Sequence, residues 1–230
     1  MIVLSVAAYG EDDRILRLLS PELGRVGAFQ RLGRRRPAGL DVGVRAKVQL
    51  REARQGGLHS LAAVEVEDAR VHLRRGFVRL ALAQYGCELV GAFSHDGHAE
   101  PRQYGLLETW LLLLDALEAD PSPTLSAPLE LKVLTFAGVA PTLDRCAVCG
   151  GPVESLMHFD VVGGGARHVR CGGGAEVDAA LLGHLEHLRR TPLRDQVDAV
   201  VDPRAAALAD ALVTAQLGHE LGARALFAGV

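Results

Sequence analysis

Three of the four cysteines in this chain have a spacing that is typical of a metal-binding knuckle. Cys146 and Cys149 form a C-x-x-C pair, and Cys171 follows after a loop of 21 residues. In a site built from two such pairs, each pair holds one tetrahedral metal ion from a tight turn. The position expected for a fourth cysteine is Gly174, which offers no ligand. The spacing therefore predicts that two distant turns meet around a small, glycine-rich centre.

A tetrahedral zinc ion would need one more ligand than the three cysteines supply. His168 and His158 are candidates, because a neutral imidazole serves as well as a thiolate in structural zinc sites. A water molecule is a third candidate for this position. The alternative is a knuckle without metal, whose turns are kept by glycines that adopt positive φ without strain. The predicted ligands of a Zn²⁺ ion are Cys146, Cys149 and Cys171, with His168 or His158.

Hydropathy and cysteine usage predict a cytoplasmic protein. With 230 residues, of which 49% are hydrophobic, the chain can build two modest cores. The apolar start at Met1 has no basic segment and is soon interrupted by acidic residues, so we expect no signal peptide. The longest apolar run, residues 110–114, is far shorter than the roughly 20 residues of a membrane-spanning helix. Cys87 stands apart from the knuckle and is predicted to be a small buried residue.

Charge is divided unevenly along the chain. The formal net charge is −3, yet residues 1–80 carry +6 and residues 81–230 carry −9. Between residues 25 and 54, nine basic residues face two acidic ones. Such asymmetry favours a polyanion as partner of the first half. Because planar guanidinium groups suit bidentate contacts with phosphate, the predominance of arginine indicates nucleic acid rather than solubility alone. A solvated basic face without a ligand is the plain alternative.

Strand-like patterns give way to helical periodicity near residue 77. Before this point, glycine and proline turns separate five short apolar segments. Five short strands with a basic surface are the outline of an OB-fold, although a small SH3-like barrel would show a similar pattern. After it, apolar residues recur at helical spacing. The predicted strands are 2–8, 15–19, 25–30, 41–50 and 61–67, and the predicted helices are 77–90, 102–119, 129–138, 178–189 and 203–226.

These elements predict an α+β protein of two domains. The first, residues 1–78, is a basic five-stranded OB-fold barrel that binds nucleic acid. The second, residues 79–230, is all-helical, with a zinc-finger-like knuckle inserted at about 142–176.

Two segments also carry a family resemblance. One comprises Tyr9 to Leu16, Pro21 to Arg25 and Gly33 to Arg36. The other, which is more specific, comprises Leu129 to Leu134, Gly138, Pro141, Leu143 and Cys146 to Gly150. Together they resemble the bacterial recombination mediator family RecO, and the resemblance extends over essentially the whole chain. It departs from the family at Gly174, where most members would carry the fourth cysteine.

This resemblance implies a DNA repair protein that acts in homologous recombination and is not an enzyme. Members of the family bind single- and double-stranded DNA without sequence specificity and anneal complementary strands. With the partner RecR they help the recombinase to displace single-stranded DNA-binding protein, whose acidic tail docks on the helical domain. The resemblance thus implies a cytoplasmic protein associated with the bacterial nucleoid.

Cations of the predicted barrel are the candidates for phosphate contacts. Arg34, Arg35 and Arg36 come first, because they lie beside Gly33 and Pro37 in what should be an exposed loop. Their charge predicts an affinity that falls steeply with salt. The predicted DNA-binding residues are Arg14, Arg25, Arg31, Arg34, Arg35, Arg36, Arg45, Lys47, Arg51 and Arg54.

Aromatic residues, on which single-strand binders stack bases, are scarce in this half. The first 80 residues contain Tyr9, Phe29 and Phe77, and the alternation of Phe29 with apolar neighbours predicts a core position. We therefore expect binding through the backbone, with little discrimination between single and double strands.

Other functions have weaker support in the sequence. An RNA-binding OB protein would show the same arginine cluster. A metal-dependent nuclease or hydrolase would use the knuckle or the acidic residues 11–13, but these are predicted to form a solvated turn. The chain contains neither a phosphate-binding P-loop motif nor H-E-x-x-H.

Overall fold

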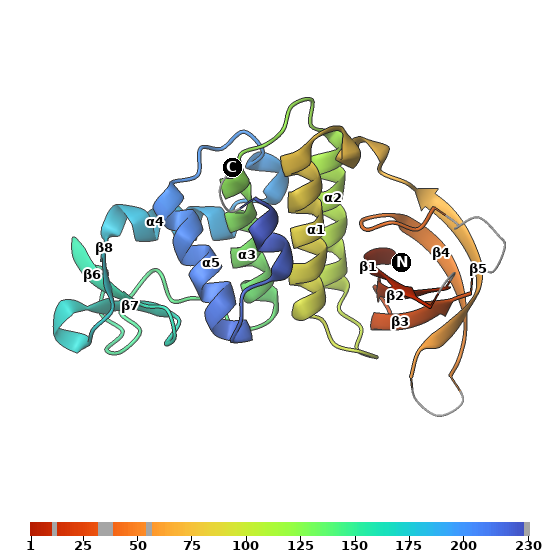
Figure 1. The fold of residues 1–230 in the computed structure, drawn as a ribbon. Helices are drawn as coiled ribbons and strands as arrows, with labels where there is room; N and C mark the ends of the chain where they lie inside the picture. Colours follow the sequence, from red (N-terminus) through yellow and green to blue (C-terminus); the bar gives the residue numbers. More distant parts are fainter. Residues whose placement is uncertain (11–12, 32–38, 54–56, 228–230) are drawn as a thin grey trace. The chain divides into compact units, whose positions relative to one another are not determined.

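The computed structural model describes residues 1–10, 13–31, 39–53 and 57–227 (Figure 1). Contacts divide the chain into two compact units. The first comprises Met1–Asp120 and Ala223–Val230, and the second comprises Pro121–Gly222. In the described residues, no helix combines the length and the apolar character needed to cross a membrane.

The first unit begins with a closed five-stranded barrel. Strands β3 and β5 are parallel, and β1 meets β4 to close the barrel, which gives the order β1-β2-β3-β5-β4. This is the strand order of an OB-fold, so the predicted barrel is confirmed and distinguished from an SH3-like one. The strands are β1 (Ile2–Tyr9), β2 (Asp13–Ser20), β3 (Gly24–Gln30), β4 (Arg45–Arg51) and β5 (His59–Asp68).

Alternation along β2 and β3 builds the barrel core. Leu16 and Leu18 point inward from β2, opposite Ala28 and Val26 of β3, and all four are buried. Burial of each leucine contributes about 1.5–3 kcal/mol. The inward-facing residues of these two strands are therefore predictable from period-two patterning.

Strand β4 begins at Arg45 rather than at residue 41, because a turn precedes it in which Gly43 has a φ of 84°.

Two helices pack against the barrel within the same unit. They are α1 (Phe77–Ala92) and α2 (Pro101–Ala116). The indole nitrogen of Trp110 donates to the carbonyl oxygen of Leu82 over 3.1 Å, which joins the two helices. Cys87 is fully buried, with its sulfur 3.8 Å from the carbonyl oxygen of Val3, as predicted for a small core residue. Burial raises the pKa of this thiol to about 12.

A buried arginine connects the barrel to α2. The side chain of Arg70 is fully buried, and its guanidinium donates to the carbonyl oxygen of Gly43 and to Glu108, both over 2.5 Å. Arg45 of β4 reaches the other oxygen of Glu108 over 2.9 Å. Because a buried charge needs a partner, these contacts fix the position of α2 on the barrel.

The last segment of the chain belongs to this unit as well. The backbone amide of Ala223 donates to Glu88 of α1 over 2.7 Å. Phe227 is buried and meets the ring of Tyr85 edge-on, with the centroids 5.3 Å apart. Contacts therefore group α1, α2 and the C-terminal segment with the barrel, whereas the predicted boundary at residue 78 marks the change from strands to helices. The division into two domains, residues 1–78 and 79–230, stays a prediction.

The second unit consists of three helices and a small sheet. The helices are α3 (Ser126–Phe136), α4 (Ala179–Arg190) and α5 (Pro203–Leu217). The sheet has the order β7-β6-β8, with strands β6 (Leu156–Asp160), β7 (Gly165–His168) and β8 (Ala175–Asp178).

The predicted helix 203–226 was wrong at its end. Gly218, with a φ of 75°, ends α5 in the left-handed conformation that commonly stops a helix, and its amide donates to the carbonyl oxygen of Thr214. A short 3-10 helix, Gly222–Leu226, follows. Apolar spacing continues through this segment, which is why periodicity alone extended the helix.

Candidate metal centre and nucleic-acid interface

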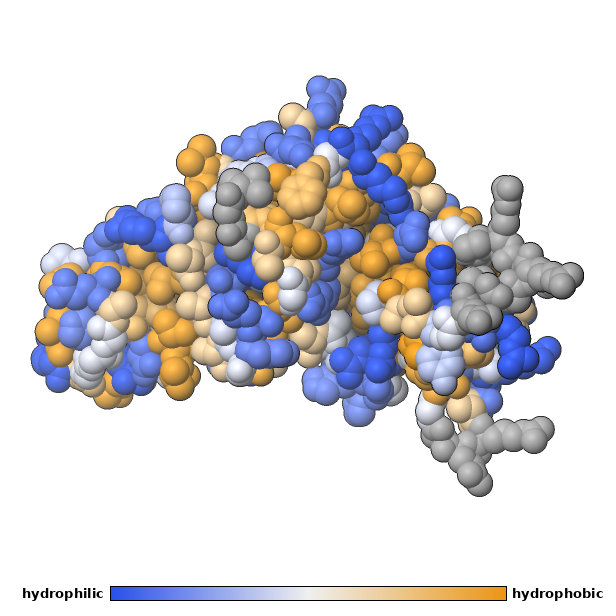
Figure 2. Space-filling view, in the orientation of Figure 1, coloured by the Kyte–Doolittle hydropathy of each residue, from blue (hydrophilic) through white to orange (hydrophobic). Residues whose placement is uncertain are grey.

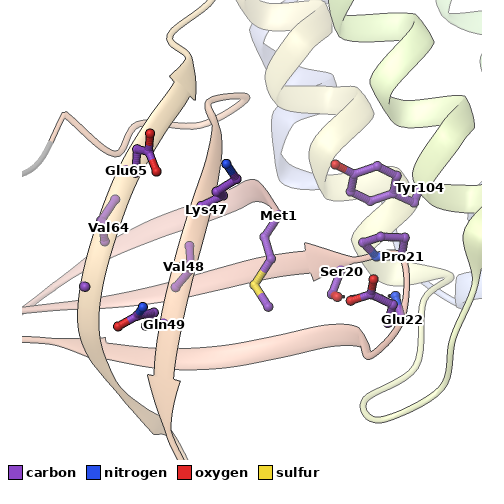
Figure 3. A pocket seen from close by; sticks show the side chains of 11 residues that line it. Met1, Ser20, Pro21, Glu22, Lys47, Val48, Gln49, Val64, Glu65 and Tyr104 are labelled. Carbon is purple, nitrogen blue, oxygen red and sulfur yellow. Dashed lines mark hydrogen bonds between the residues drawn. The ribbon is translucent and has the colours of Figure 1, made fainter.

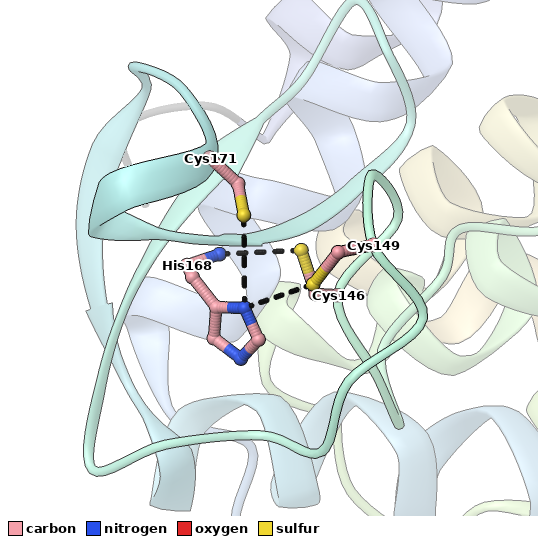
Figure 4. Close-up of side chains that lie close together, drawn as sticks. All are labelled: Cys146, Cys149, His168 and Cys171. Atoms are coloured by element: carbon pink, nitrogen blue, oxygen red, sulfur yellow. Dashed lines mark hydrogen bonds between the residues drawn. The ribbon is translucent and has the colours of Figure 1, made fainter.

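Four side chains of the second unit converge on one point. The ligand atoms of Cys146, Cys149, His168 and Cys171 all lie within 4.8 Å of one another (Figure 4). Nδ1 of His168 is 3.3 Å from the sulfur of Cys149 and 3.8 Å from that of Cys171. With zinc bonds of about 2.0–2.3 Å, neighbouring ligands of a tetrahedral site lie about 3.5–3.8 Å apart. The cluster therefore has the donor set and spacing to hold one metal ion, although the structure does not identify the metal.

The orientation of His168 is set by the other nitrogen of its ring. Nε2 lies 2.8 Å from the carbonyl oxygen of Pro152. A carbonyl can only accept, so Nε2 carries the proton and Nδ1 presents its lone pair to the sulfurs (Figure 4). Ligating histidines usually make such a hydrogen bond to a backbone carbonyl or carboxylate. The ring is thus held in the tautomer that a metal requires.

Backbone amides prepare the sulfur of Cys146 for a cation. Burial favours the neutral thiol, but hydrogen bonds from the amides of Cys149, His168 and Val148 outweigh it and lower the pKa of Cys146 to about 6. Burial and the neighbouring thiols raise the pKa of Cys171 to about 11. Opposite shifts in adjacent thiols mean that negative charge is stabilised at one sulfur and opposed at the next, which a bound cation would relieve.

Gly174 has no room for a side chain. Its φ is 152°, and a Cβ atom there would lie 2.4 Å from the carbonyl oxygen of Phe159. A cysteine therefore does not fit this backbone, and His168 takes the place of the expected ligand. His158 is not part of the cluster, because its Nδ1 lies 2.8 Å from the carbonyl oxygen of Gly172. Neither distinction follows from spacing along the chain.

Three of the predicted DNA-binding cations have carboxylate partners. Arg25 pairs with Asp96 over 2.7 Å. Arg45 pairs with Glu108, and Lys47 lies 3.6 Å from Glu67. These carboxylates reduce the charge that the three cations offer to a ligand, and their role in DNA binding stays a prediction.

Other predicted cations are less encumbered. Arg31 and Arg51 are exposed and Arg14 is half-buried, and among the residues that the structure describes none of the three has an ion-pair partner. Arg34, Arg35, Arg36 and Arg54 lie outside the described residues.

Sequence reasoning missed Arg17. It is exposed in the middle of β2, opposite Ser5 and Gly27, and no carboxylate within the described ranges pairs with it. Its position between the inward-facing Leu16 and Leu18 is the signal that could have identified it, because neighbours in a strand point to opposite faces.

The prediction that Phe29 lies in the core was wrong. The inward face of β3 carries Val26 and Ala28, and Phe29 lies on the outer face, where it is half-buried. Its ring meets that of Tyr9 edge-on, with the centroids 5.6 Å apart and the planes at 88°. The period of two that places Val26 and Ala28 inside also places Phe29 outside.

A pocket of about 550 Å³ opens elsewhere on the first unit, between β4, β5 and α2 (Figure 3). Lys47 and the amino group of Met1 bring positive charge to it, whereas Glu22 and Glu65 bring negative charge. Burial lowers the pKa of that amino group, which donates to the carbonyl oxygen of Ala46 over 2.7 Å. Mixed charge makes this pocket a poor receptor for a phosphate backbone.

Family models match both parts of the chain. Residues 1–70 match "Recombination protein O N terminal", and residues 74–226 match "Recombination protein O C terminal". The chain belongs to the RecO family of DNA repair proteins. It is 35% identical to DNA repair protein RecO of Myxococcus xanthus over 234 residues, which cover 97% of this chain and 91% of the relative. It is 35% identical to that of Symbiobacterium thermophilum over 198 residues, 82% of this chain and 77% of the relative.

Membership of the RecO family agrees with the two features described above, the OB barrel and the cysteine and histidine cluster. The matched N-terminal region contains the whole OB barrel, and the matched C-terminal region contains the cysteine and histidine cluster. Neither the family descriptions nor the names of these RecO relatives state a catalytic activity.

Proposed function

We propose that this RecO chain is a recombination mediator that binds single- and double-stranded DNA through its OB barrel, without sequence specificity. The observation that carries the proposal is the set of exposed arginines on the barrel, Arg17, Arg31 and Arg51, which have no carboxylate partner among the described residues. Exposed guanidinium groups are suited to phosphate oxygens, and each contact releases condensed counterions.

Strand annealing follows from backbone-led binding. A protein that neutralises phosphates reduces the repulsion between two strands and leaves base edges free to pair. Annealing therefore needs no catalytic group, and we propose that the chain is not an enzyme.

Membership of the RecO family also supports a proposal about the partners of this chain. We propose that the chain acts with RecR and helps the recombinase onto DNA coated by single-stranded DNA-binding protein, in the cytoplasm at the nucleoid. Within the second unit, Arg194 is a candidate to receive that protein's acidic tail, because its side chain is 75% exposed and its ion pair with the exposed Asp195 is long, at 3.8 Å. Arg189 and Arg190 are less available because both pair with Glu186.

We propose that the metal at the knuckle is Zn²⁺ and that its role is structural. Four protein ligands would complete a tetrahedron and leave no open position for a reactive water, as a hydrolase would need. The nearby carboxylate of Glu154 pairs with Arg170 over 2.7 Å. Thiolate and imidazole donors suit zinc better than Mg²⁺, which argues against a magnesium-dependent nuclease at this site.

Fluorescence anisotropy across a salt series tests DNA binding, with annealing followed in the same samples. Affinity for both single strands and duplex should fall steeply with salt. Replacing Arg17 and Arg31 together with glutamate should weaken binding and reduce the salt slope by about one per arginine. The matched control is Arg194→Glu, a charge reversal in the second unit. Affinity that is independent of salt, or unchanged in the double variant, would contradict the proposal, and tighter binding to RNA would favour the RNA-binding alternative.

A further inference from the structure

The outer face of strands β1, β2 and β3 carries an apolar surface that the barrel core does not use. Tyr9 is 57% exposed at the end of β1, and its ring meets the edge of Phe29 from β3. Ile15 of β2 lies between them in register, paired with Ala7 on one side and with Phe29 on the other. We call Tyr9, Ile15 and Phe29 the aromatic face.

The packing of the aromatic face orients its rings. Side chains directly opposite each other in paired strands have Cβ atoms about 4.5–5.5 Å apart. The side chain of Ile15 therefore lies beside that of Phe29 on the outer face. The perpendicular arrangement of Tyr9 and Phe29 is a favourable geometry for two aromatic rings. A ring already held in place loses little conformational entropy when a ligand stacks on it.

Positive charge flanks the aromatic face. Arg17 is two residues from Ile15 within β2, so it lies on the same side of the sheet at about 7 Å, and the exposed Arg31 directly follows the end of β3. Asp13 is the one acidic residue of β1, β2 and β3, and it pairs in register with Tyr9, at the end of the aromatic face that lies away from Arg17. In the space-filling view, hydrophobic areas of the barrel are interspersed with hydrophilic ones (Figure 2). An apolar surface bordered by arginines complements an unpaired base with its phosphate.

We propose that the aromatic face is a stacking platform for one or two bases of single-stranded DNA, with Arg17 and Arg31 contacting the adjoining phosphates. The proposal rests on the DNA binding proposed above and adds a preference to it. Bases in a duplex are already stacked on each other, whereas those of a single strand present open faces to aromatic rings. We therefore expect single strands to bind more tightly than duplex, in contrast to the weak discrimination that the scarcity of aromatic residues predicts. A platform of this size leaves neighbouring bases free to pair.

The test compares three probes with the 230-residue chain across a salt series: a strand of thymidines, an abasic strand of equal length, and a duplex. The thymidine strand should bind at least about fivefold more tightly than the abasic strand, since stacking on one ring contributes at least about 1 kcal/mol. Tyr9→Ala should remove this difference and leave duplex binding unchanged, and Tyr9→Trp should retain it. Phe77→Ala is the matched control, because Phe77 is also exposed, at 61%, but lies on α1.

Two failures are distinguishable. If Tyr9→Ala retains the preference for thymidine, or if thymidine and abasic strands bind equally well while binding still depends on salt, the stacking platform is wrong and backbone binding stands. If no probe shows salt-dependent binding, the proposed function fails and the platform fails with it. Thermal unfolding checks each variant, and Phe29→Leu replaces Tyr9→Ala if that variant does not fold.

Discussion

Nε2 of His168 donates a hydrogen bond to the carbonyl oxygen of Pro152 over 2.8 Å, which directs Nδ1 of the same ring toward the knuckle sulfurs. This one contact connects the tautomer of a side chain to the choice of a metal ligand. His158, ten residues earlier, instead has its Nδ1 at the backbone carbonyl of Gly172. Two histidines that spacing along the chain treats alike therefore have different roles.

Replacement of His168 should weaken metal binding. We expect His168→Ala to reduce zinc affinity at least about tenfold, because the ion would retain three protein ligands and a water. Zinc content after purification and competition with a chelator measure this. His158→Ala is the control and should keep one zinc per chain, so equal losses in the two variants would refute the assignment of His168.

Introducing a cysteine at position 174 should destabilise the knuckle rather than complete it. Its Cβ would lie 2.4 Å from the carbonyl oxygen of Phe159, at a φ of 152° that L-residues rarely adopt. We expect Gly174→Cys to lower the free energy of unfolding by about 1–3 kcal/mol or more. Gly173→Cys is the matched control, since no atom lies within 4 Å of a Cβ there. Unchanged stability of Gly174→Cys would show that the backbone can shift to accept it.

Loss of the buried partner of Arg70 should destabilise the first unit strongly. Glu108→Ala leaves the fully buried guanidinium of Arg70 with Asp68, 3.5 Å from its Nε, as the remaining carboxylate, and we expect a loss at the lower end of about 3–5 kcal/mol in denaturant unfolding. Glu67→Ala is the comparison, because its partners, Lys47 at 3.6 Å and Arg45 at 3.5 Å, have side chains that are 71% and 38% exposed, and such pairs contribute about 1 kcal/mol or less. Similar effects of the two substitutions would mean that the buried pair does not hold α2.

Acid should remove the contribution of a helix cap. Asp178 accepts from the amide of Leu181 at the start of α4 and pairs with Arg204, and these contacts lower the pKa of its carboxyl. A lowered folded-state pKa contributes stability above the unfolded value near 4, and this contribution is lost as pH falls through the folded-state pKa. Asp178→Ala should therefore lower the Tm at pH 7, with the difference closing below about pH 4.

A control distinguishes the cap from the ion pair. Asp178→Asn keeps an oxygen that can accept from Leu181 but loses the charge that faces Arg204, so its Tm at pH 7 should lie between those of the other two proteins. A difference between Asp178→Ala and the unchanged protein that persists at low pH would contradict the role of the ionised carboxyl.

Local patterning by itself determined the barrel strands β1 to β5 and the helices α1 to α5, whereas the small sheet β7-β6-β8 was not predicted. Alternation of residues such as Leu16 and Leu18 placed the strands, and helical spacing placed α1 to α5, because these periods depend on backbone geometry that neighbouring residues share. The pair Cys146 and Cys149 likewise marked the knuckle, since a C-x-x-C turn is local.

Only the tertiary structure decided which distant groups meet. It placed His168 rather than His158 in the cluster, and it left no space for a side chain at position 174 beside the backbone of Phe159. It brought Arg45 to Glu108 of α2. It also brought Tyr9 against Phe29 on the outside of the barrel. The physical reason is that ligand sets, ion pairs and stacked rings depend on the register and packing of segments far apart in the chain, which the period of any one segment does not contain.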